Sequence, residues 1–330
     1  MKNLRIKKIL SLMTVLIMTL MLAACGSQDT TQKEEGEAKE EKSYTIGFSS
    51  LTLGDNYCKA LADAIEKYAE AEGWKCTVLE GQVDATKQIE TIDTFYNQNV
   101  DLVMVQPIPG VESSLVKFNE RGTPVLFVNS YPTITEEFEL DYYYVGSKET
   151  EAGEEQAKYL AEVLPENAKV CIVLNALGFT NTEQRRDGFA DKIAELRPDV
   201  EIIEEQTGDS DTNKTMSVVE DWLQLYGDDG IDAIVSDCNA STLGIVEVLK
   251  THNLTGKVLV AGIDCLSPYG PDNLIEGNVA VDIFQNPDEQ ARIAVETAKK
   301  VLNGEEVDPE VWVKWEPVTA ENAEDYYDRY

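Results

Sequence analysis

Residues 44–80 decide the fold class of this chain, and they read YTIGFSSLTLGDNYCKALADAIEKYAEAEGWKCTVLE. Their two ends, Tyr44–Ser49 and Lys75–Glu80, are short and largely apolar, which is typical of strands in a sheet that is covered on both faces. Between them, apolar residues recur at the i, i+3, i+4, i+7 spacing of an amphipathic helix: Leu61, Ala64, Ile65, Tyr68 and Ala69. The stretch therefore predicts two parallel strands joined by a helix, the repeating unit of α/β proteins.

The same alternation continues along the rest of the chain. Eight further runs predict strands: Leu102–Val105, Val125–Val128, Tyr143–Gly146, Lys169–Leu174, Val200–Glu205, Ala233–Ser236, Val258–Gly262 and Val279–Phe284. Helices are predicted between them, including one that Asp211 caps and that runs to Tyr226. Because ten strands are more than one ordinary sheet needs, we expect an α/β fold with two doubly wound parallel-sheet lobes.

Residues 1–24 resemble a bacterial lipoprotein signal peptide. Four basic residues precede an uncharged apolar run: Lys2, Arg5, Lys7 and Lys8 before Ile9–Leu22. The run is shorter than the ~20 apolar residues that span a bilayer, which argues against the alternative of an uncleaved membrane helix. Small residues then lead into Cys25. The resemblance implies that Cys25 is lipidated and anchors the protein to the cell membrane, outside the cytoplasm.

A polar, acidic segment follows the cysteine. Residues 25–43 contain no aliphatic side chain larger than alanine, so we expect a lipidated Cys25 followed by a disordered tether. The formal net charge of the chain is −33, and it becomes −37 without residues 1–24, which hold four basic and no acidic residues. So acidic a chain is repelled by nucleic acid and by anionic lipid surfaces, and neither is expected to bind it.

The sequence lacks the motifs of enzymes and cofactor-binding proteins. The sole histidine, His252, has no catalytic or metal-binding pattern around it, and the motifs G-x-S-x-G, GxxxxGK[ST] and GxGxxG do not occur. The five cysteines beyond Cys25 form no CxxC pair, and we expect buried free thiols; a disulfide between Cys238 and Cys265 is the alternative. No cofactor, bound metal or enzymatic activity is expected.

Ligands of open α/β sheets bind beyond the carboxyl ends of the strands. In this chain the corresponding segments are Leu51–Cys58, Gln106–Gly110, Asn129–Tyr131, Ala176–Glu183, Asp237–Asn239, Asp264–Leu266 and Gln285. They are rich in Asp, Asn, Gln, Tyr and Phe, and such a mixture suits a polyhydroxylated ligand with hydroxyl groups and an apolar face. Polar residues gather in any set of loops, however, so composition alone leaves both interpretations open.

Several short motifs, in this order, resemble the ribose- and galactose-type periplasmic binding proteins, the extracytoplasmic receptors of sugar ABC transporters. They are Ile46–Ser49, Asp55–Tyr57, Leu102–Pro107, Thr123–Val125, Gln184–Phe189, Val260–Asp264 and Phe284–Pro287. The resemblance extends from Tyr44 to about Pro317. It implies a monomeric protein of two lobes that close over a small sugar-like ligand and then dock on an ABC permease.

The resemblance also implies where the chain passes between the lobes. The three hinge crossings are expected at Gly146–Glu149, Phe284–Pro287 and Lys314–Pro317. The first lobe would then comprise residues 44–147 and 286–315. The second lobe would comprise residues 148–285 and 316–330.

Several ligand contacts of the family have counterparts here. Asp264 and Gln285 match a family aspartate and glutamine that bind the sugar, and Tyr57 matches a stacking aromatic residue. Asn129 stands where the family has aspartate, and Asp55 stands where it has asparagine. The resemblance thus implies that these five residues contact the ligand.

Other positions depart from the family pattern. Glu183 and Ser130 fall on family arginines, and Cys58 falls on the second ring of an aromatic pair. A family Asn-Asp pair is replaced by Cys238 and Asn239, with Asp237 just before them. We include Glu183, Asp237, Cys238 and Asn239 among the expected ligand contacts. The loss of two guanidinium groups argues against the familiar pentose and hexose ligands.

These replacements predict an acidic cleft if Asp55, Glu183, Asp237 and Asp264 converge. We therefore expect a neutral polyol or modified sugar, with a cationic ligand such as an amino sugar as the alternative. An anionic sugar is not expected, because burying an anion among acids lacks compensation.

Two other functions and one other site are compatible with parts of the sequence. A sensory subunit for a membrane kinase or chemoreceptor would use the same closing lobes. An exported hydrolase could use Asp55 and Asp264 as an acid/base pair. Residues 209–220 match the spacing of a calcium-binding loop, but Lys214 stands where that loop needs glycine, so the start of a capped helix is favoured.

Overall fold

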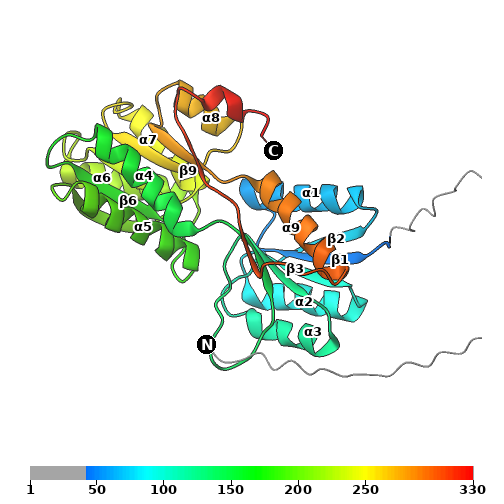
Figure 1. Ribbon diagram of the computed structural model, residues 1–330. Coiled ribbons are helices and arrows are strands. Elements are labelled where there is room, and N and C mark those ends of the chain that lie inside the picture. The colour runs from blue at the N-terminus through cyan, green and yellow to red at the C-terminus, as the bar shows by residue number, and fades with distance from the viewer. Residues whose placement is uncertain (1–41, 330) are drawn as a thin grey trace, which may run out of the picture. The chain divides into compact units, whose positions relative to one another are not determined.

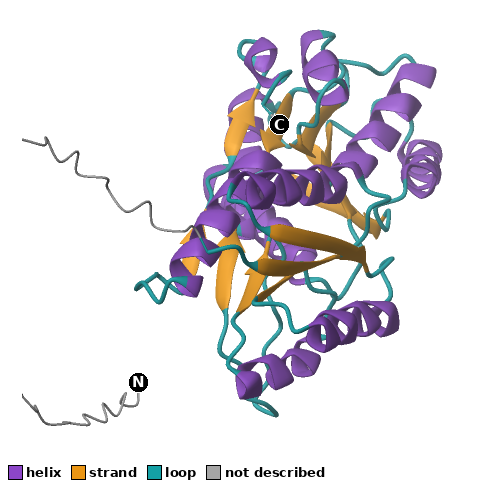
Figure 2. Cartoon of the chain, turned by 90° about the vertical axis from the view of Figure 1, so that its right-hand side faces the viewer, coloured by secondary structure: helices purple, strands orange, loops and turns teal. Residues whose placement is uncertain are grey.

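The computed structural model of the chain describes residues 42–329, which form two lobes, each built on a six-stranded sheet with helices on both faces (Figure 1). Figure 2 shows the helices as layers outside the strands. The predicted signal peptide, Cys25 and the tether as far as residue 41 lie outside the described residues. Within residues 42–329, no helix has both the length and the apolar character that crossing a membrane requires.

The first lobe contains the sheet with strand order β11-β5-β4-β3-β1-β2, in which every pairing is parallel. Its strands are β1 (Thr45–Ser50), β2 (Lys75–Glu80), β3 (Leu102–Val105), β4 (Val125–Val128), β5 (Tyr143–Gly146) and β11 (Glu310–Trp312). One face packs against α1 (Asn56–Ala71) and α9 (Pro287–Leu302). The other face packs against α2 (Ala85–Gln98), the short helix η1 (Glu112–Leu115) and α3 (Val116–Arg121).

The second lobe contains the sheet with strand order β12-β10-β9-β8-β6-β7, parallel except for the antiparallel pair of β10 and β12. Its strands are β6 (Lys169–Leu174), β7 (Glu201–Thr207), β8 (Ala233–Ser236), β9 (Leu259–Asp264), β10 (Val281–Phe284) and β12 (Glu316–Val318). One face packs against α4 (Glu149–Val163) and α5 (Thr180–Leu196). The other face packs against α6 (Thr212–Tyr226), α7 (Asn239–Thr251), α8 (Tyr269–Ile275) and η2 (Ala323–Tyr326).

The predicted fold class is confirmed: both sheets are doubly wound, and all ten predicted strands are present with ends that differ by at most two residues. The short apolar runs form strands because both faces of each sheet are covered, so that every residue of β3, β4, β8 and β10 is buried. The two strands that were not predicted, β11 and β12, have three residues each. They exist because they pair with β5 and β10 at the edges of the sheets, which local sequence does not reveal.

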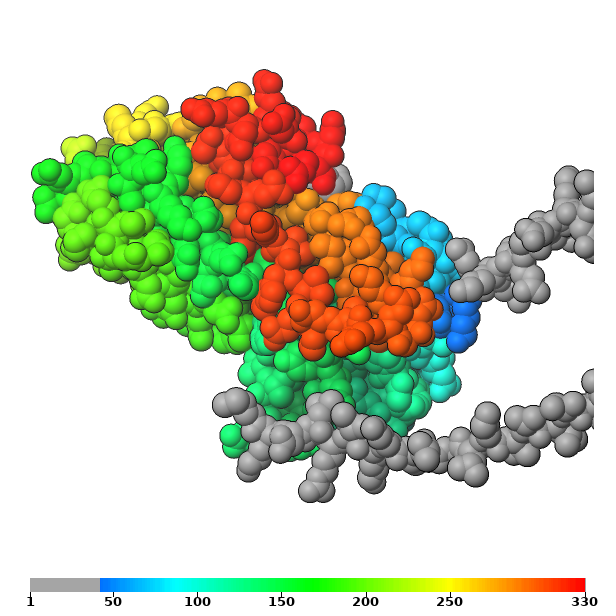
Figure 3. Space-filling model, viewed as in Figure 1, coloured from blue at the N-terminus to red at the C-terminus, as the bar shows by residue number. Residues whose placement is uncertain are grey.

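The chain changes sheets three times within the described residues: between β5 and β6, between β10 and α9, and between β11 and β12. These places include the three expected hinge crossings, while the exact lobe limits given above remain predictions. Figure 3 shows the orange-to-red C-terminal stretch running over the surface from α9 to the second lobe. Leu266, which follows β9 of the second lobe, is buried in the apolar cluster of the first lobe and so forms a contact between the two lobes.

Helices α4 and α5 lie close together because two glycines leave room at their contact. A Cβ atom at Gly153 would lie 2.0 Å from the carbonyl oxygen of Arg185, and one at Gly188 would lie 2.2 Å from that of Thr150. Only glycine permits such an approach of two backbones. The contact fixes the position of Arg185 on α5.

Candidate ligand-binding site

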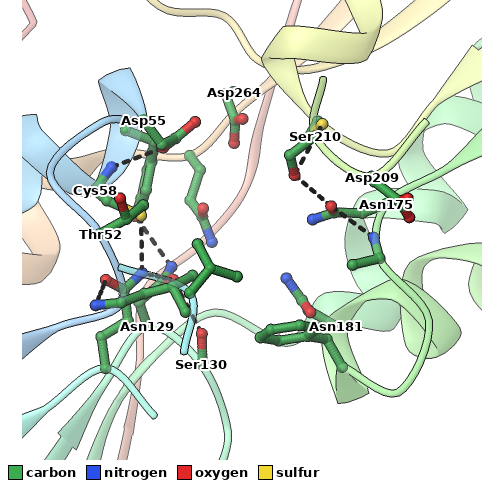
Figure 4. A pocket seen from close by; sticks show the side chains of 18 of the residues that line it. Thr52, Asp55, Cys58, Asn129, Ser130, Asn175, Asn181, Asp209, Ser210 and Asp264 are labelled. Atoms are coloured by element: carbon green, nitrogen blue, oxygen red, sulfur yellow. Dashed lines mark hydrogen bonds between the residues drawn. The ribbon is translucent and has the colours of Figure 1, made fainter. Parts of the chain in front are cut away.

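A cavity of about 140 Å³ lies where the carboxyl ends of strands from both sheets meet. Figure 4 shows Thr52, Asp55, Cys58, Asn129 and Ser130 on one side of it, and Asn175, Asn181, Asp209 and Ser210 on the other. The first group belongs to the first lobe and the second group to the second lobe. The position agrees with the rule that open α/β sheets bind ligands beyond the carboxyl ends of their strands.

On the first-lobe side, the loop after β1 places Asp55, Tyr57 and Cys58 at the start of α1. Asp55 is the N-cap of this helix, and its Oδ1 accepts a hydrogen bond of 2.9 Å from the backbone N–H of Cys58. Tyr57 and Cys58 are buried in the first turn of the helix. The helix start thus delivers a carboxylate, a ring and a thiol to the cavity.

A chain of amide hydrogen bonds forms the floor on the same side. Gln106 Nε2 donates to Asn129 Oδ1 (2.9 Å), and Asn129 Nδ2 donates to the Tyr57 hydroxyl and to Gln290 Oε1, both at 3.3 Å. Asn129 follows β4 with φ +67°, a left-handed conformation that asparagine tolerates. This network is neutral and holds its members in place without a ligand.

On the second-lobe side, a buried charge cluster surrounds Arg185. Its Nε donates to Glu149 Oε2 at 2.6 Å, and its Nη1 donates to the backbone carbonyl of Asp237 at 2.7 Å. Arg185 Nη1 also lies 3.7 Å from Asp237 Oδ1, which has no hydrogen-bond partner among the described residues. Burial raises the pKa of Asp237 to about 7, although Arg185 opposes this shift. One guanidinium is therefore shared between two carboxyl groups.

Asp264 is the last residue of β9 and reaches the cavity from a strained backbone. Its φ is +89° and that of Cys265 is +47°, values that residues with a Cβ rarely adopt and that often occur at binding sites. Asp264 Oδ2 accepts a 3.0 Å hydrogen bond from the backbone N–H of Asn239. Burial raises the pKa of Asp264 to about 6; Arg185 opposes the shift and Asp55 adds to it.

Gln285, directly after β10, lines the cavity with an unsatisfied group. The residue is 1% exposed, and its Nε2 has no hydrogen-bond partner among the described residues. A buried donor without a partner costs about 1–3 kcal/mol. A ligand oxygen would remove this cost.

Two contacts already join the lobes beside the cavity. The Thr180 hydroxyl donates to the backbone carbonyl of Tyr131 at 3.2 Å. Phe179, the N-cap residue of α5, packs against the apolar cluster of α2 and α3 in the first lobe. Its ring and that of Tyr57 are the aromatic rings that line the cavity.

Six of the nine predicted contact residues line the cavity: Asp55, Tyr57, Asn129, Cys238, Asp264 and Gln285. The other three do not. Glu183 is exposed on α5, while Asp237 and Asn239 are buried just outside the lining, the former against Arg185 and the latter as a donor to Asp264. The expected convergence of four acids is thus reduced to Asp55 and Asp264 at the cavity, with Asp237 behind it. Contact with a ligand remains a prediction for every residue of the lining.

Several lining residues were not among the predicted contacts. They are Leu51, Thr52, Cys58, Val83, Gln106, Ser130, Asn175, Ala176, Phe179, Asn181, Arg185, Asp209 and Ser210. Asn181 and Arg185 could have been found from helix periodicity, because they are four residues apart and lie on one face of α5, whereas Glu183 lies between them on another face. Asp209 and Ser210 follow β7, whose carboxyl end was not among the predicted ligand-facing segments.

The two other motifs have structural roles. The five cysteines among the described residues are free thiols, so Cys238 and Cys265 form no disulfide. In the segment 209–220, Asp211 caps α6 by accepting a 2.7 Å hydrogen bond from the Lys214 N–H, and the Lys214 side chain pairs with Asp209. The segment therefore forms the capped helix start that the sequence favoured.

Two α/β lobes with a polar cavity between them are the hallmark of the binding proteins that close over a small ligand. The chain belongs to the family described as periplasmic binding protein domain, whose model matches residues 46–306. This confirms the resemblance and the fold inferred from the sequence. Because the family consists of binding proteins, it also confirms the expectation of a binding protein rather than an enzyme.

Individual relatives match over almost the whole chain. The ribose import binding protein RbsB of Bacillus subtilis (strain 168) is 27% identical over 304 residues, which are 91% of this chain and 95% of the relative. The structure of an ABC transporter solute binding protein from Bacillus halodurans C-125 with bound myo-inositol is 27% identical, with a TM-score of 0.79 and coverage of 87% and 98% of the two chains. The structure of a periplasmic solute binding protein from Actinobacillus succinogenes 130z with bound D-allose is 24% identical and has a TM-score of 0.80, with coverage of 86% and 100%; it shows the shared fold.

Proposed function

We propose that this protein captures a sugar or another polyhydroxylated small molecule in the cavity between its lobes and delivers it to the permease of an ABC importer. The observation that carries this proposal is the lining itself: polar side chains from both lobes converge with the rings of Tyr57 and Phe179. Hydroxyl groups need hydrogen-bond partners, and the C–H face of a sugar packs on rings. The names of the relatives agree, since they include a ribose import protein and a solute binding protein with bound myo-inositol.

A panel of small molecules tests the proposal by thermal shift and calorimetry. The panel contains D-ribose, D-glucose, D-galactose, D-allose, myo-inositol, sorbitol, the cationic amino sugar D-glucosamine, two sugar phosphates and two sugar acids. We expect at least one uncharged or cationic member to bind, and a ligand at a hundred times its Kd should stabilise the folded protein by ~2.7 kcal/mol. Failure of every sugar and polyol to stabilise the protein would contradict the proposal. Tight binding of a sugar phosphate or acid would contradict the preference against anions.

We propose further that Cys25 is lipidated and holds the protein at the outer face of the cell membrane. The support is the sequence pattern alone: basic residues, the apolar run Ile9–Leu22 and small residues before Cys25. Metabolic labelling with an alkyne fatty acid should mark the wild-type chain and leave Cys25→Ser unmarked. Equal labelling of the two chains would contradict this proposal.

We also propose that the protein acts as a monomer, because each lobe closes its own core and the cavity is lined by one chain. Light scattering of the chain without residues 1–25 should give the mass of one copy at micromolar concentration. A mass of two copies would contradict this expectation.

A further inference from the structure

Two carboxylates face the cavity from different lobes. Asp55 belongs to the start of α1 and Asp264 to the end of β9, and Figure 4 shows both side chains at the same end of the cavity. Their charges are close enough for Asp55 to act on Asp264. Neither has an ion-pair partner within 4.0 Å among the described residues. Asp55 accepts from the backbone N–H of Cys58 and also interacts with the thiol of that residue, and Asp264 accepts from the backbone N–H of Asn239.

The positive charges near the cavity are already paired. Among the lining residues, the guanidinium of Arg185 is the one cation, and Glu149 and Asp237 share it. The third lining carboxylate, Asp209, is paired with Lys214. The carboxylates of Asp55 and Asp264 thus have no cation of their own, and the positive charge that acts on Asp264 is that of Arg185, which Glu149 and Asp237 already share.

A second observation, independent of the acids, concerns Gln285. Its Nε2 is buried and has no partner within residues 42–329, and a donor of this kind requires an acceptor oxygen on the molecule that fills the cavity. An inorganic cation alone would not satisfy it. The occupant must therefore offer an acceptor oxygen to the amide as well as a positive charge to the two carboxylates.

We propose that the ligand is a sugar or polyol that carries one protonated amine, with the ammonium group held between Asp55 and Asp264 and a hydroxyl or ring oxygen bound by Gln285. This inference rests on the proposed function and narrows its ligand class. The ammonium bonds to a carboxylate of each lobe and so favours the closed form.

The surroundings of Asp264 make this binding pH-dependent. Burial and Asp55 raise the pKa of Asp264 to about 6, while Arg185 opposes the shift, and Glu149 raises this pKa further. Asp282 lies behind it, buried and with its own pKa well above the usual value because of burial. An ammonium group favours ionised Asp264, so affinity for an amine should fall as the pH drops through about 6. Affinity for a neutral analogue should change less.

Calorimetry with matched sets of compounds tests the proposal at pH 7.5 and low salt. The sets are D-glucose, D-glucosamine and N-acetyl-D-glucosamine; D-galactose, D-galactosamine and N-acetyl-D-galactosamine; sorbitol and 1-amino-1-deoxysorbitol; and myo-inositol and an amino-inositol. In the set of the right stereochemistry, we expect the free amine to bind on the order of tenfold or more tightly than the hydroxyl and acetylated members. The advantage should shrink between pH 7.5 and pH 5.5.

Asp55→Asn is the decisive variant, because asparagine caps a helix as well as aspartate does and only the charge is lost. It should lose most of the preference for the amine. Asp63→Asn, on the exposed part of the same helix, is the matched control and should keep the preference. A preference that survives unchanged in Asp55→Asn would overturn the role of the carboxylate pair.

The other outcomes distinguish a failure of the ammonium proposal from a failure of the proposed function. If the neutral member binds as tightly as the amine in every set that binds, the ammonium proposal is wrong and the proposed function stands. If no member of any set binds, the proposed function fails and the ammonium proposal fails with it.

Discussion

The first lobe presents the cavity with amides that hydrogen-bond one another, whereas the second lobe presents charges and polar atoms that lack partners. Gln106, Asn129 and Gln290 form a continuous neutral network beneath Tyr57. On the other side, Arg185 is shared by two acids, and Asp237 Oδ1 and Gln285 Nε2 have no hydrogen-bond partner in the part of the chain that the structure describes. The difference indicates that the first-lobe side of the cavity is formed in the absence of ligand, whereas a bound ligand would stabilise the second-lobe side more.

The largest expected effect comes from the charge cluster. Arg185→Met leaves Glu149 and Asp237 buried without their cation, so we expect the free energy of unfolding at pH 7.5 to fall by about 3–5 kcal/mol. The neighbouring Arg186, whose side chain is 38% exposed, provides the control: Arg186→Met should cost less than about 1 kcal/mol. Urea denaturation measures both. Equal stability of the two variants would show that the cluster does not hold the second lobe together.

The pH dependence of stability tests the same charge cluster on the second-lobe side of the cavity. Because burial raises the pKa of Asp237 to about 7, the folded state binds a proton that the unfolded state, with a pKa near 3.9, releases earlier. The free energy of unfolding should therefore decrease as the pH rises from about 4 to about 7. In Asp237→Asn, the decrease in the free energy of unfolding between about pH 4 and about pH 7 should be smaller by about 2–3 kcal/mol. Urea denaturation at several pH values measures this difference. Parallel curves for variant and wild type would contradict the raised pKa.

The first-lobe network should respond with a smaller loss. Asn129→Ala leaves Gln106 Nε2 without its amide acceptor and Gln290 Oε1 without the Asn129 donor, which should lower the free energy of unfolding by about 1–3 kcal/mol in the absence of ligand. Urea denaturation of the free protein is the measurement. A variant as stable as the wild type would mean that the network forms only with ligand, and the contrast between the faces would disappear.

The smallest effect on stability, and the one gain, is expected at Gln285. Gln285→Met keeps the length of the side chain and removes a buried donor that has no partner among the described residues, so the free energy of unfolding of the free protein should rise by about 1 kcal/mol. The same variant should weaken binding of the tightest compound of the panel on the order of tenfold, as calorimetry would show. Unchanged affinity would mean that this amide does not touch the ligand.

The sequence predicted the two sheets well because buried parallel strands leave a strong local pattern. Apolar runs such as Leu102–Val105 and Val125–Val128 are completely buried, and their limits were found without error. The three-residue strands β11 and β12 depend on partners more than 150 and about 30 residues away, β5 and β10 respectively, and no local pattern marks them. Edge pairing of this kind follows from the tertiary structure alone.

The site was predicted less completely, and the failures have physical causes. Residues at the end of a strand, such as Asp264, or directly after one, such as Asn129, reach the cavity because of the direction of the strand. The family pattern placed Glu183 at the site, but the periodicity of α5 turns Asn181 and Arg185 toward the cavity and Glu183 toward solvent. The unsatisfied amide of Gln285 and the sharing of Arg185 depend on atoms from distant elements and appear only in three dimensions.

Gly153 and Gly188 do not line the cavity, yet the close contact of α4 with α5 that they permit can control ligand chemistry. Both residues lie where α4 and α5 touch, and the carbonyl of Arg185 is one of the atoms that a methyl group at Gly153 would displace. The guanidinium of Arg185 is carried by α5. Its position in the cavity wall therefore depends on how closely the backbones of α4 and α5 approach each other. Selection for a different solute could therefore act through the spacing of a helix pair while every side chain that faces the solute stays the same.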